Sequence, residues 1–573
     1  MKFDRRTFLR LAAYASAASA LRFTAGCSDD DPVDRMFPQG IASGDPLPDG
    51  VLLWTRVETA TRVRYEVAAD PSFASVVAAG EVDADPDRDQ TVRLEITGLE
   101  PGTTYYYRFV ADGVTSPLGR TRTAPNPDAD VPVRIALASC QDFAGRWFHA
   151  WRTLLERDDI DLVLFIGDYI YETIGHLGKQ PPPERTIELP DGMALEDPLK
   201  GTLAALTLAD YRALYRQYRR DPDLRAVHAK FPFVTIWDDH EFANDCWRDH
   251  ATDFDDTYGD ELSTERRQAA TRAWYEHHPI RRPFAPAAGF PADLSVQRAL
   301  RWGKHVELVL LDERYHRDDH LVPEGPLDRA VGHFTKNSAF GSRTFVIKSE
   351  FDTREAAAQP TMLGAAQRDW AISTVNASTA TWKLLASPLV MAQMVVDMSA
   401  YDSLPEMFRQ RFYFKTDQWD GFRSERRALL EACAGVDNLV VLSGDLHGFY
   451  AAELHADFDA AAEPLAVEYA VSAISAPTIE VQLTDVVAQS PILAGLGLGD
   501  LVPQFDANVL ATNPHMRHAE STKNGLAIVD VSATDVIVTF VEVEGVTERT
   551  GGATREVAFR TRAGSRRIEA HGA

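Results

Sequence analysis

Four apolar stretches of the chain each end at side chains that can bind a metal. They are VRIALASC, DLVLFIGDYIY, FVTIWDDHEFAND and NLVVLSGDLH. Uninterrupted aliphatic and β-branched runs predict strands buried on both faces, and such strands present functional residues at their carboxyl ends. The polar side chains at the four ends are Cys140, Asp168, Tyr171, Asp238, Asp239, His240, Asn244, Asp445 and His447. We therefore predict one shared metal centre.

An aspartate after an apolar run also has an ordinary structural explanation. It is often a helix N-cap or a turn former, and for any one stretch this explanation is the simpler. The four ends together favour a metal site, because they combine thiol, phenol, imidazole and carboxylate groups. Capping would have used Ser and Thr as readily.

The pattern changes along the chain. Residues 34–125 show short alternating segments between Gly, Pro and Asp turns, which predicts an antiparallel β-sandwich, and GLEPGTTYYYRF resembles a fibronectin type III turn and strand. Residues 126–545 alternate apolar runs with helix-like stretches, which predicts an α/β domain. Residues after Gly551 are strand-like and then basic and polar, and we expect residues 546–573 to form a loosely held tail.

The first 33 residues are predicted to be an export signal and linker. DRRTFLR places twin arginines before a short apolar stretch that Arg22 interrupts, which is typical of a twin-arginine signal rather than a membrane span. This predicts an extracytoplasmic protein, periplasmic or secreted, with the twin-arginine export machinery as a partner. TAGC, ending at Cys27, resembles a lipoprotein cleavage site, so a lipid anchor and plain cleavage both remain open.

Composition and charge narrow the class of partner. The 573 residues are 45% hydrophobic and 25% charged, as in folded globular proteins with more than one domain. The formal net charge of −26 argues against a nucleic-acid scaffold. It also means that a site for phosphate needs local cations, which bound metals provide.

The donor types indicate which metals fit. Tyrosine is a poor ligand for divalent ions because its pKa is about 10, so Tyr171 points to a trivalent ion. The Cys140 thiolate supports the same choice. Calcium takes oxygen ligands, which suits carboxylates and the Asn244 amide. The alternative is that Tyr171 packs on the surface and Cys140 in the core.

Further side chains are candidates for catalysis or support. His447, two residues after Asp445, faces the same side if the strand continues, whereas alternation turns Asp238 away from Asp239 into a supporting role. Arg314, and with it Arg317 in LDERYHR, could grip phosphate oxygens, or equally form a structural salt bridge.

The motifs GDYIY, WDDHEFAND, LDERYHR, SPLVMAQ, QWDGF, SGDLHGFY and NPHMRH occur in this order. In order and spacing the chain resembles the alkaline phosphatase D family, the PhoD-like metallophosphoesterases, which are distantly similar to purple acid phosphatases. The resemblance covers nearly the whole chain. His316 and Phe422 stand where the family commonly has Tyr, which leaves substrate preference open.

The resemblance implies a four-layer α/β/β/α sandwich with an Fe3+ and Ca2+ centre. Cys140, Asp168, Tyr171 and His447 would bind the iron, and Asp168 would bridge to a calcium held also by Asp239, Asn244 and Asp445.

The implied function is a secreted phosphoester hydrolase in which a metal-activated hydroxide attacks phosphorus in line. Arg314 would stabilise the phosphoryl charge, and His240 or His515 would protonate the leaving group. One alternative is a phosphodiesterase or phospholipase D acting on teichoic acid, phospholipid or nucleic-acid fragments. Another is a non-catalytic extracytoplasmic binding protein.

Overall fold

The centre of the molecule is a pair of large sheets that share one core. The computed structural model describes residues 31–175, 182–195, 202–251, 261–322 and 343–572. Along the central strands, alternate residues enter different cores: Leu162 and Leu164 face the space between the sheets, whereas Val163 and Phe165 face helices. Burial on both faces explains why these strands are apolar without interruption.

The first sheet has ten strands and combines both ends of the chain. Its neighbours β9, β10 and β14 run parallel, and β27 pairs antiparallel with β9. In spatial order the strands are β30 (Glu569–His571), β29 (Gly552–Arg562), β28 (Asp535–Glu544), β27 (Asn524–Val531), β9 (Val133–Ala138), β10 (Leu162–Ile166), β14 (Phe233–Ile236), β1 (Ile41–Leu47), β2 (Gly50–Arg56) and β5 (Thr91–Thr97).

The second sheet has seven strands and packs its inner face against the first. In spatial order they are β17 (Arg298–Trp302), β18 (Val306–Leu310), β20 (Trp382–Ala386), β23 (Leu439–Ser443), β25 (Ala466–Ala470), β24 (Phe449–Leu454) and β26 (Met516–Glu520). A three-stranded sheet lies beside it, formed by β19 (Thr344–Ile347), β22 (Arg411–Lys415) and β21 (Val395–Asp397).

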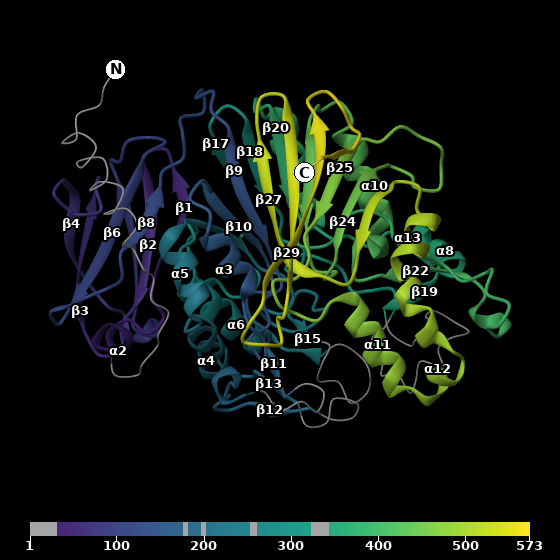
Figure 1. Ribbon diagram of the computed structural model, residues 1–573, viewed down its shortest axis with the longest axis horizontal. Coiled ribbons are helices and arrows are strands. Elements are labelled where there is room, and N and C mark those ends of the chain that lie inside the picture. Colours follow the sequence, from purple (N-terminus) through teal and green to yellow (C-terminus); the bar gives the residue numbers. More distant parts are fainter. Residues whose placement is uncertain (1–30, 176–181, 196–201, 252–260, 323–342, 573) are drawn as a thin grey trace, which may run out of the picture.

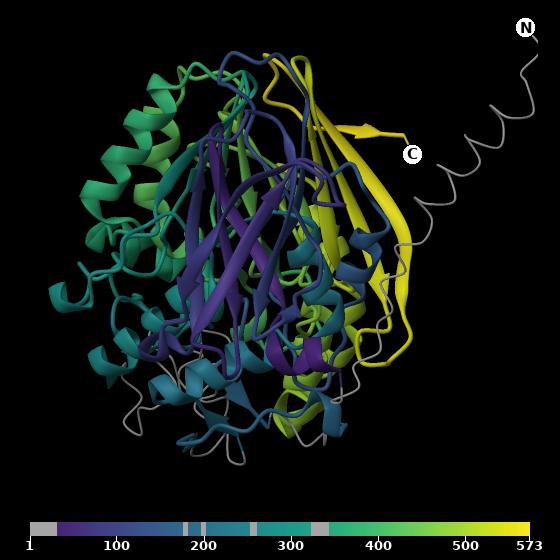
Figure 2. The same cartoon turned by 90° about the vertical axis from the view of Figure 1, so that its left-hand side faces the viewer.

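Helices cover the outer faces of both sheets. The outer core of the ten-stranded sheet includes residues of α3 (His149–Leu155), α4 (Leu208–Tyr218), α5 (Pro222–Lys230) and α6 (Thr264–His277). The outer core of the seven-stranded sheet includes residues of α9 (Gly364–Ala377), α10 (Arg423–Ala432), α11 (Ile479–Gln489), α12 (Pro491–Gly495) and α13 (Phe505–Thr512). α8 (Lys348–Ala358) packs in a smaller core with β22. The chain is therefore a mixed α/β fold with helices outside two facing sheets (Figures 1 and 2).

The N-terminal strands form a second unit at one end of the molecule (Figure 1). A separate sheet of β4 (Val76–Asp83), β3 (Arg62–Ala68), β6 (Thr104–Ala111), β7 (Val114–Thr115) and β8 (Gly119–Arg122) shares a core with β1, β2 and β5. The sandwich is not detached from the rest, because β1 pairs in parallel with β14 at Gly44 and Phe233. Its likeness to fibronectin type III stays a prediction.

The last residues are part of the sheet. The strand-like pattern after Gly551 agrees with β29, whereas the loose tail predicted over residues 546–573 is wrong. β29 pairs with β28 from Gly552 to Arg562, and β30 pairs with β29. Phe559, 7% exposed, belongs to the core between the two sheets. The α/β unit therefore extends past residue 545.

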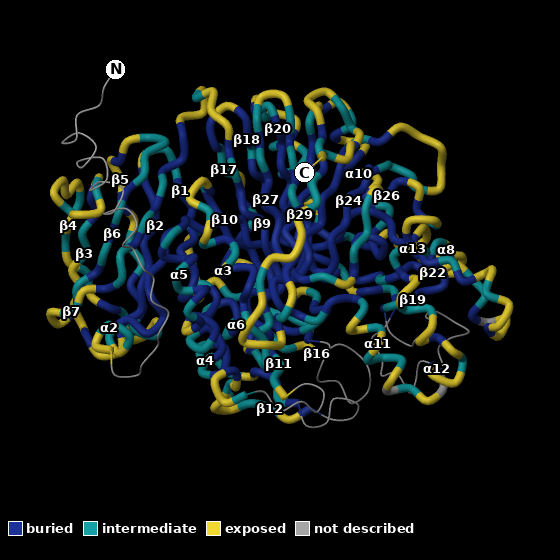
Figure 3. The backbone as a smooth tube through the Cα atoms, in the orientation of Figure 1, coloured by how far each residue is buried: buried dark blue, intermediate teal, exposed yellow. Residues whose placement is uncertain are grey.

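Residues of the central strands are buried, and the exposed residues lie mainly in the outer loops (Figure 3). No helix in the described part of the chain has both the length and the hydropathy to cross a bilayer. The export signal and Cys27 lie outside the described residues.

Candidate metal centre

The carboxyl ends of four strands meet at one place. β9, β10 and β14 run parallel and lead to Cys140, Asp168 and Asp239, while β23 of the second sheet leads to Asp445 and His447. A bridge between Ser139 and Ala473 joins the two sheets at this edge. The predicted convergence of strand ends is thus what the structure has.

One group combines a thiol, a carboxylate, a phenol and an imidazole. Ligand atoms of Cys140, Asp168 and His447 lie within 4.8 Å of one another. The Tyr171 Oη lies 3.2 Å from Asp168 Oδ2 and 3.2 Å from His447 Nε2. The four side chains predicted to bind one metal are therefore neighbours.

A second group shares Asp168 with the first. Carboxylate oxygens of Asp168, Asp238, Asp239 and Asp445 lie within 4.8 Å of one another. Asp168 is thus placed to bridge two cations. The expectation that Asp238 turns away is wrong, because the chain leaves the strand after Ile236 and strand alternation no longer applies. Asn244 lines the adjacent cavity.

The backbone is strained at these positions. Cys140, Asp168, Asp445 and His447 have φ of 58°, 59°, 58° and 52°, in the left-handed region that residues other than glycine rarely adopt. Such conformations cost on the order of 1–3 kcal/mol each and persist where the surroundings fix them, often at functional sites. The strain coincides with the predicted ligands.

The buried carboxylates of the centre lack the partners that they would need without bound cations. Burial, reinforced by Asp239, raises the pKa of Asp168 well above its usual value. Asp168 Oδ1 and Asp238 Oδ2 are buried and accept no hydrogen bond from the described residues. Such orphaned acceptors beside a thiol and an imidazole are what metal ions would satisfy.

His447 is oriented as a ligand. Its Nδ1 lies 2.6 Å from the carbonyl oxygen of Pro477 and 2.9 Å from Gln482 Nε2. The shorter contact is to an oxygen that only accepts, so it assigns the hydrogen to Nδ1. The lone pair of Nε2 then faces Tyr171 and Asp168. Burial lowers the pKa of His447 to about 4, which keeps the ring neutral as metal binding requires.

Two glutamates that the sequence analysis missed support the ligands. Glu241 accepts hydrogen bonds from the backbone N–H groups of Asp168, Tyr169 and Asp238, and so ties the ends of β10 and β14 together. Glu172 accepts from the N–H of Asn244 at 2.9 Å and lies 2.6 Å from His240 Nδ1. Both follow ligands closely in GDYIYE and DDHE, which is the signal that could have found them.

Arg314 is not placed to grip a substrate. Its side chain is fully buried and pairs with Asp238 at 2.5 Å, Asp239 at 3.3 Å and Asp417 at 3.0 Å. Arg317 also pairs with Asp417 at 3.0 Å. The structural salt bridge, one of the two interpretations of this motif, is therefore the one observed, and Arg314 positions the acidic ligands.

A cavity of about 1430 Å³ opens beside the centre. His240, Asp445, His447 and Lys415 are among its lining residues. His515 lies apart: its Nε2 is 2.8 Å from the Gln393 carbonyl oxygen, and its ring packs 4.5 Å from that of Phe458. The structure therefore brings His240, and not His515, to the centre.

His240 also belongs to a third possible ligand group with Asp168 and Asp239. Burial disfavours the imidazolium, but Glu172 and Asp239 raise the pKa of His240 well above its usual value. The ring lies 4.1 Å from that of Tyr171. Its position suits either metal binding or proton transfer.

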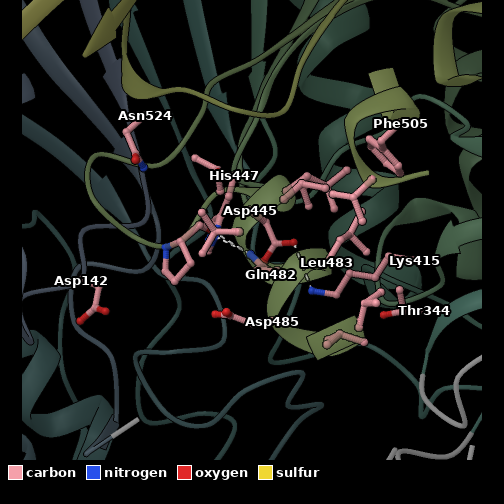
Figure 4. A pocket seen from close by; sticks show the side chains of 18 of the residues that line it. Asp142, Thr344, Lys415, Asp445, His447, Gln482, Leu483, Asp485, Phe505 and Asn524 are labelled. Atoms are coloured by element: carbon pink, nitrogen blue, oxygen red, sulfur yellow. Dashed lines mark hydrogen bonds and ion pairs between the residues drawn. The ribbon is translucent and has the colours of Figure 1, made fainter. Parts of the chain in front are cut away.

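Lys415 is a positively charged side chain at the cavity wall, where Arg314 is not exposed. It ends β22, and its Nζ lies 3.6 Å from both Asp445 Oδ2 and Asp245 Oδ1. Figure 4 shows its pair with Asp445 as a dashed line at the cavity. Burial opposes its charge, but Asp445 and Asp245 raise the pKa of Lys415 well above its usual value, so it is protonated.

Comparisons with known proteins identify the class of protein to which the chain belongs. A family model described as PhoD-like phosphatase matches residues 135–540, and one described as PhoD-like phosphatase, N-terminal domain, matches residues 22–125. Alkaline phosphatase D of Bacillus subtilis (strain 168) is 31% identical over 479 residues, 80% of this chain and 73% of the relative. A structure of PhoD aligns with a TM-score of 0.73 at 27% identity, over 94% of this chain and 92% of that one. A purple acid phosphatase from yellow lupin aligns with a TM-score of 0.48 at 10% identity, over 91% of this chain and 74% of the lupin protein.

The fold, the ligand cluster and the matched relatives define a metal-dependent phosphoesterase, a phosphoric ester hydrolase. More particularly, the chain belongs to the PhoD-like phosphatase family. The interpretation as a non-catalytic binding protein is therefore not retained.

The close approach of Gly167 to Asp238 gives a first prediction. Gly167 has φ of +113°, and a Cβ there would lie 2.5 Å from Asp238 Cβ. Gly167→Ala should therefore displace Asp238 and abolish both metal retention and ester hydrolysis, measured by elemental analysis and initial rates. Gly98→Ala is the matched control, because Gly98 has φ of +78° with nothing within 4 Å. Full metal content in Gly167→Ala would contradict the proposed packing.

The buried position of Arg314 gives a second prediction. Arg314→Met leaves the buried Asp238 without its cation and Asp417 with Arg317 alone, so the free energy of unfolding should fall by about 3–5 kcal/mol in denaturant titrations. As a control, Lys304→Met removes an exposed ion pair with Asp130 and should change the free energy of unfolding by about 0–1 kcal/mol. An Arg314→Met protein of unchanged stability with only a raised KM would instead support a substrate contact.

Proposed function

We propose that the chain is an exported phosphoester hydrolase whose centre holds Fe3+ and Ca2+. The observation that carries this proposal is the donor set that converges on Asp168: Cys140, Tyr171 and His447 on one side, and Asp239 and Asp445 on the other. Asn244 completes the proposed calcium ligands from the cavity wall.

The protonation of the donors supports a trivalent ion on the first side. Burial, with Asp168 nearby, raises the pKa values of the Cys140 thiol and the Tyr171 phenol well above their usual values. A bound divalent ion already deprotonates a coordinating thiol, but the phenol of Tyr171 holds its proton more tightly, and iron(III) displaces it better than divalent ions do. The second side offers carboxylate and amide oxygens alone, which suits calcium.

The chain's own side chains take three tasks in the proposed reaction. When bound, the metals activate water and stabilise the phosphoryl charge. Lys415, which borders the centre beside Asp445, contacts a phosphoryl oxygen in place of the buried Arg314. Glu172 fixes the His240 ring through Nδ1, which leaves Nε2 to donate a proton to the leaving oxygen. Glu241 and Arg314 hold the ligands in position.

The ester type and the cellular location belong to the same proposal. A cavity of about 1430 Å³ is larger than a phosphate monoester needs, which favours a diester with two substituents as the second candidate. Arg5 and Arg6 ahead of a short apolar stretch support export, and Cys27 supports a lipid anchor. The N-terminal sandwich is proposed to be fibronectin-like.

Hydrolysis of 4-nitrophenyl phosphate and bis(4-nitrophenyl) phosphate, measured side by side, tests the proposal. The metal-loaded protein should hydrolyse at least one ester, and the ratio of the two kcat/KM values identifies the preferred type. Lys415→Met should lower kcat/KM by about 100-fold, as removal of one stabilising donor does in other enzymes, with Lys304→Met as control.

Absence of hydrolysis of both esters by the metal-loaded protein would contradict the hydrolase. Full activity in Lys415→Met would remove only the proposed role of Lys415.

A further inference from the structure

The cavity has an apolar arm that the metal centre does not use. It runs between α11 and α13 on one side and the three-stranded sheet on the other. Phosphate chemistry needs charged and polar groups, whereas this part of the wall is mainly aliphatic and aromatic, with Gln482, Asp485, Gln504 and Asn508 as its polar members. Its lining residues include Phe345, Met398, Phe414, Ile479, Leu483 and Phe505.

One wall of the arm is the apolar face of α11. Ile479, Leu483, Val486 and Val487 occupy positions i, i+4, i+7 and i+8, the spacing of a stripe that normally packs against a core. Ile479 belongs to the outer core of the seven-stranded sheet and the other three pack against it, but all four also line the cavity, and Leu483, Val486 and Val487 are only partly buried. An apolar stripe that borders open volume leaves a surface that an apolar ligand can cover.

The floor of the arm is a row of three aromatic rings. The ring of Phe414 lies 5.5 Å from Phe345 and 4.8 Å from Phe505. Phe345 has φ of 55°, a strained conformation for a bulky residue, and its side chain lines the cavity. The row is thus preformed, which lowers the entropy lost when a ligand binds.

The arm and the metal centre are built on the same elements. Phe414 precedes Lys415 in β22, and Ile479 follows Pro477, whose carbonyl oxygen orients His447. Leu483 and Phe505 line the same cavity as Lys415, Asp445 and His447, and Figure 4 labels all five residues around it. A substituent of an ester bound at the centre therefore has direct access to the arm.

We propose that the arm binds a long alkyl or acyl chain, so that the preferred substrates are phosphoesters with one extended apolar substituent. This inference rests on the proposed ester hydrolysis and adds the chemical class of the substituent. The Leu483 side of α11 and the Phe505 ring are its specificity-determining contacts.

The test is a series of esters that differ only in chain length. Alkyl phosphates or methyl alkyl phosphates, whichever type the protein hydrolyses, are compared from ethyl to decyl at concentrations below micelle formation. We expect kcat/KM to rise by about two- to fourfold per added methylene until the arm is filled, since each buried methylene contributes up to about 0.8 kcal/mol. The ethyl ester measures the centre alone.

Leu483→Gln places a polar group in the arm and should flatten the dependence on chain length, measured relative to the ethyl ester of the same variant. Leu510→Gln is the matched control, because Leu510 is 39% exposed on the neighbouring α13 and is absent from the described cavity lining. Thermal unfolding of both variants separates a local effect from misfolding.

Two failures are distinguishable. If the ethyl ester is hydrolysed but kcat/KM does not change with chain length, the apolar arm has no role in substrate binding and this inference is wrong. If no ester of either type is hydrolysed by the metal-loaded protein, the proposed function itself fails.

Discussion

The structure depends on how it stabilises negative charge that is buried between two sheets. Asp168, Asp238 and Asp239 are each about 1% exposed, and their carboxylates lie within a few ångströms of one another. Buried like charges repel strongly unless cations lie between them. Arg314 neutralises one side of this cluster and Lys415 borders another, while the acceptors that remain face one another where metals would bind. Cys140 and Asp445, whose side chains belong to the two ligand groups, have strained backbone conformations of the kind that persist where the surroundings fix them.

The ends of the buried strands were predictable from sequence. An apolar run such as LVLFI has to be covered on both faces, so its end fixes where Asp168 lies. Asp238 and Arg314 were harder, because both follow the end of a strand, where side-chain direction depends on loop hydrogen bonds rather than on alternation. Lys415 was missed because it ends a short strand of a small sheet, remote in sequence from its partners.

The C-terminal strand shows a different limit. β29 is eleven residues long, yet only Phe559 and Thr561 are buried, so its sequence carries a weak apolar signal. Its place is set by pairing with β28, a tertiary interaction that no local pattern encodes. The apolar stripe of α11 is the converse case, because its spacing is plain in the sequence but its exposure to a cavity is visible only in the structure.

The central claim is that Tyr171 and Cys140 share an iron(III) ion at the end of the first sheet. The most direct test is metal analysis together with the visible absorption spectrum of protein purified without chelator. The account predicts bound iron and calcium and a broad visible band that disappears in Tyr171→Phe but persists in Tyr106→Phe, since Tyr106 lies in the N-terminal sandwich. A colourless protein without iron would contradict it.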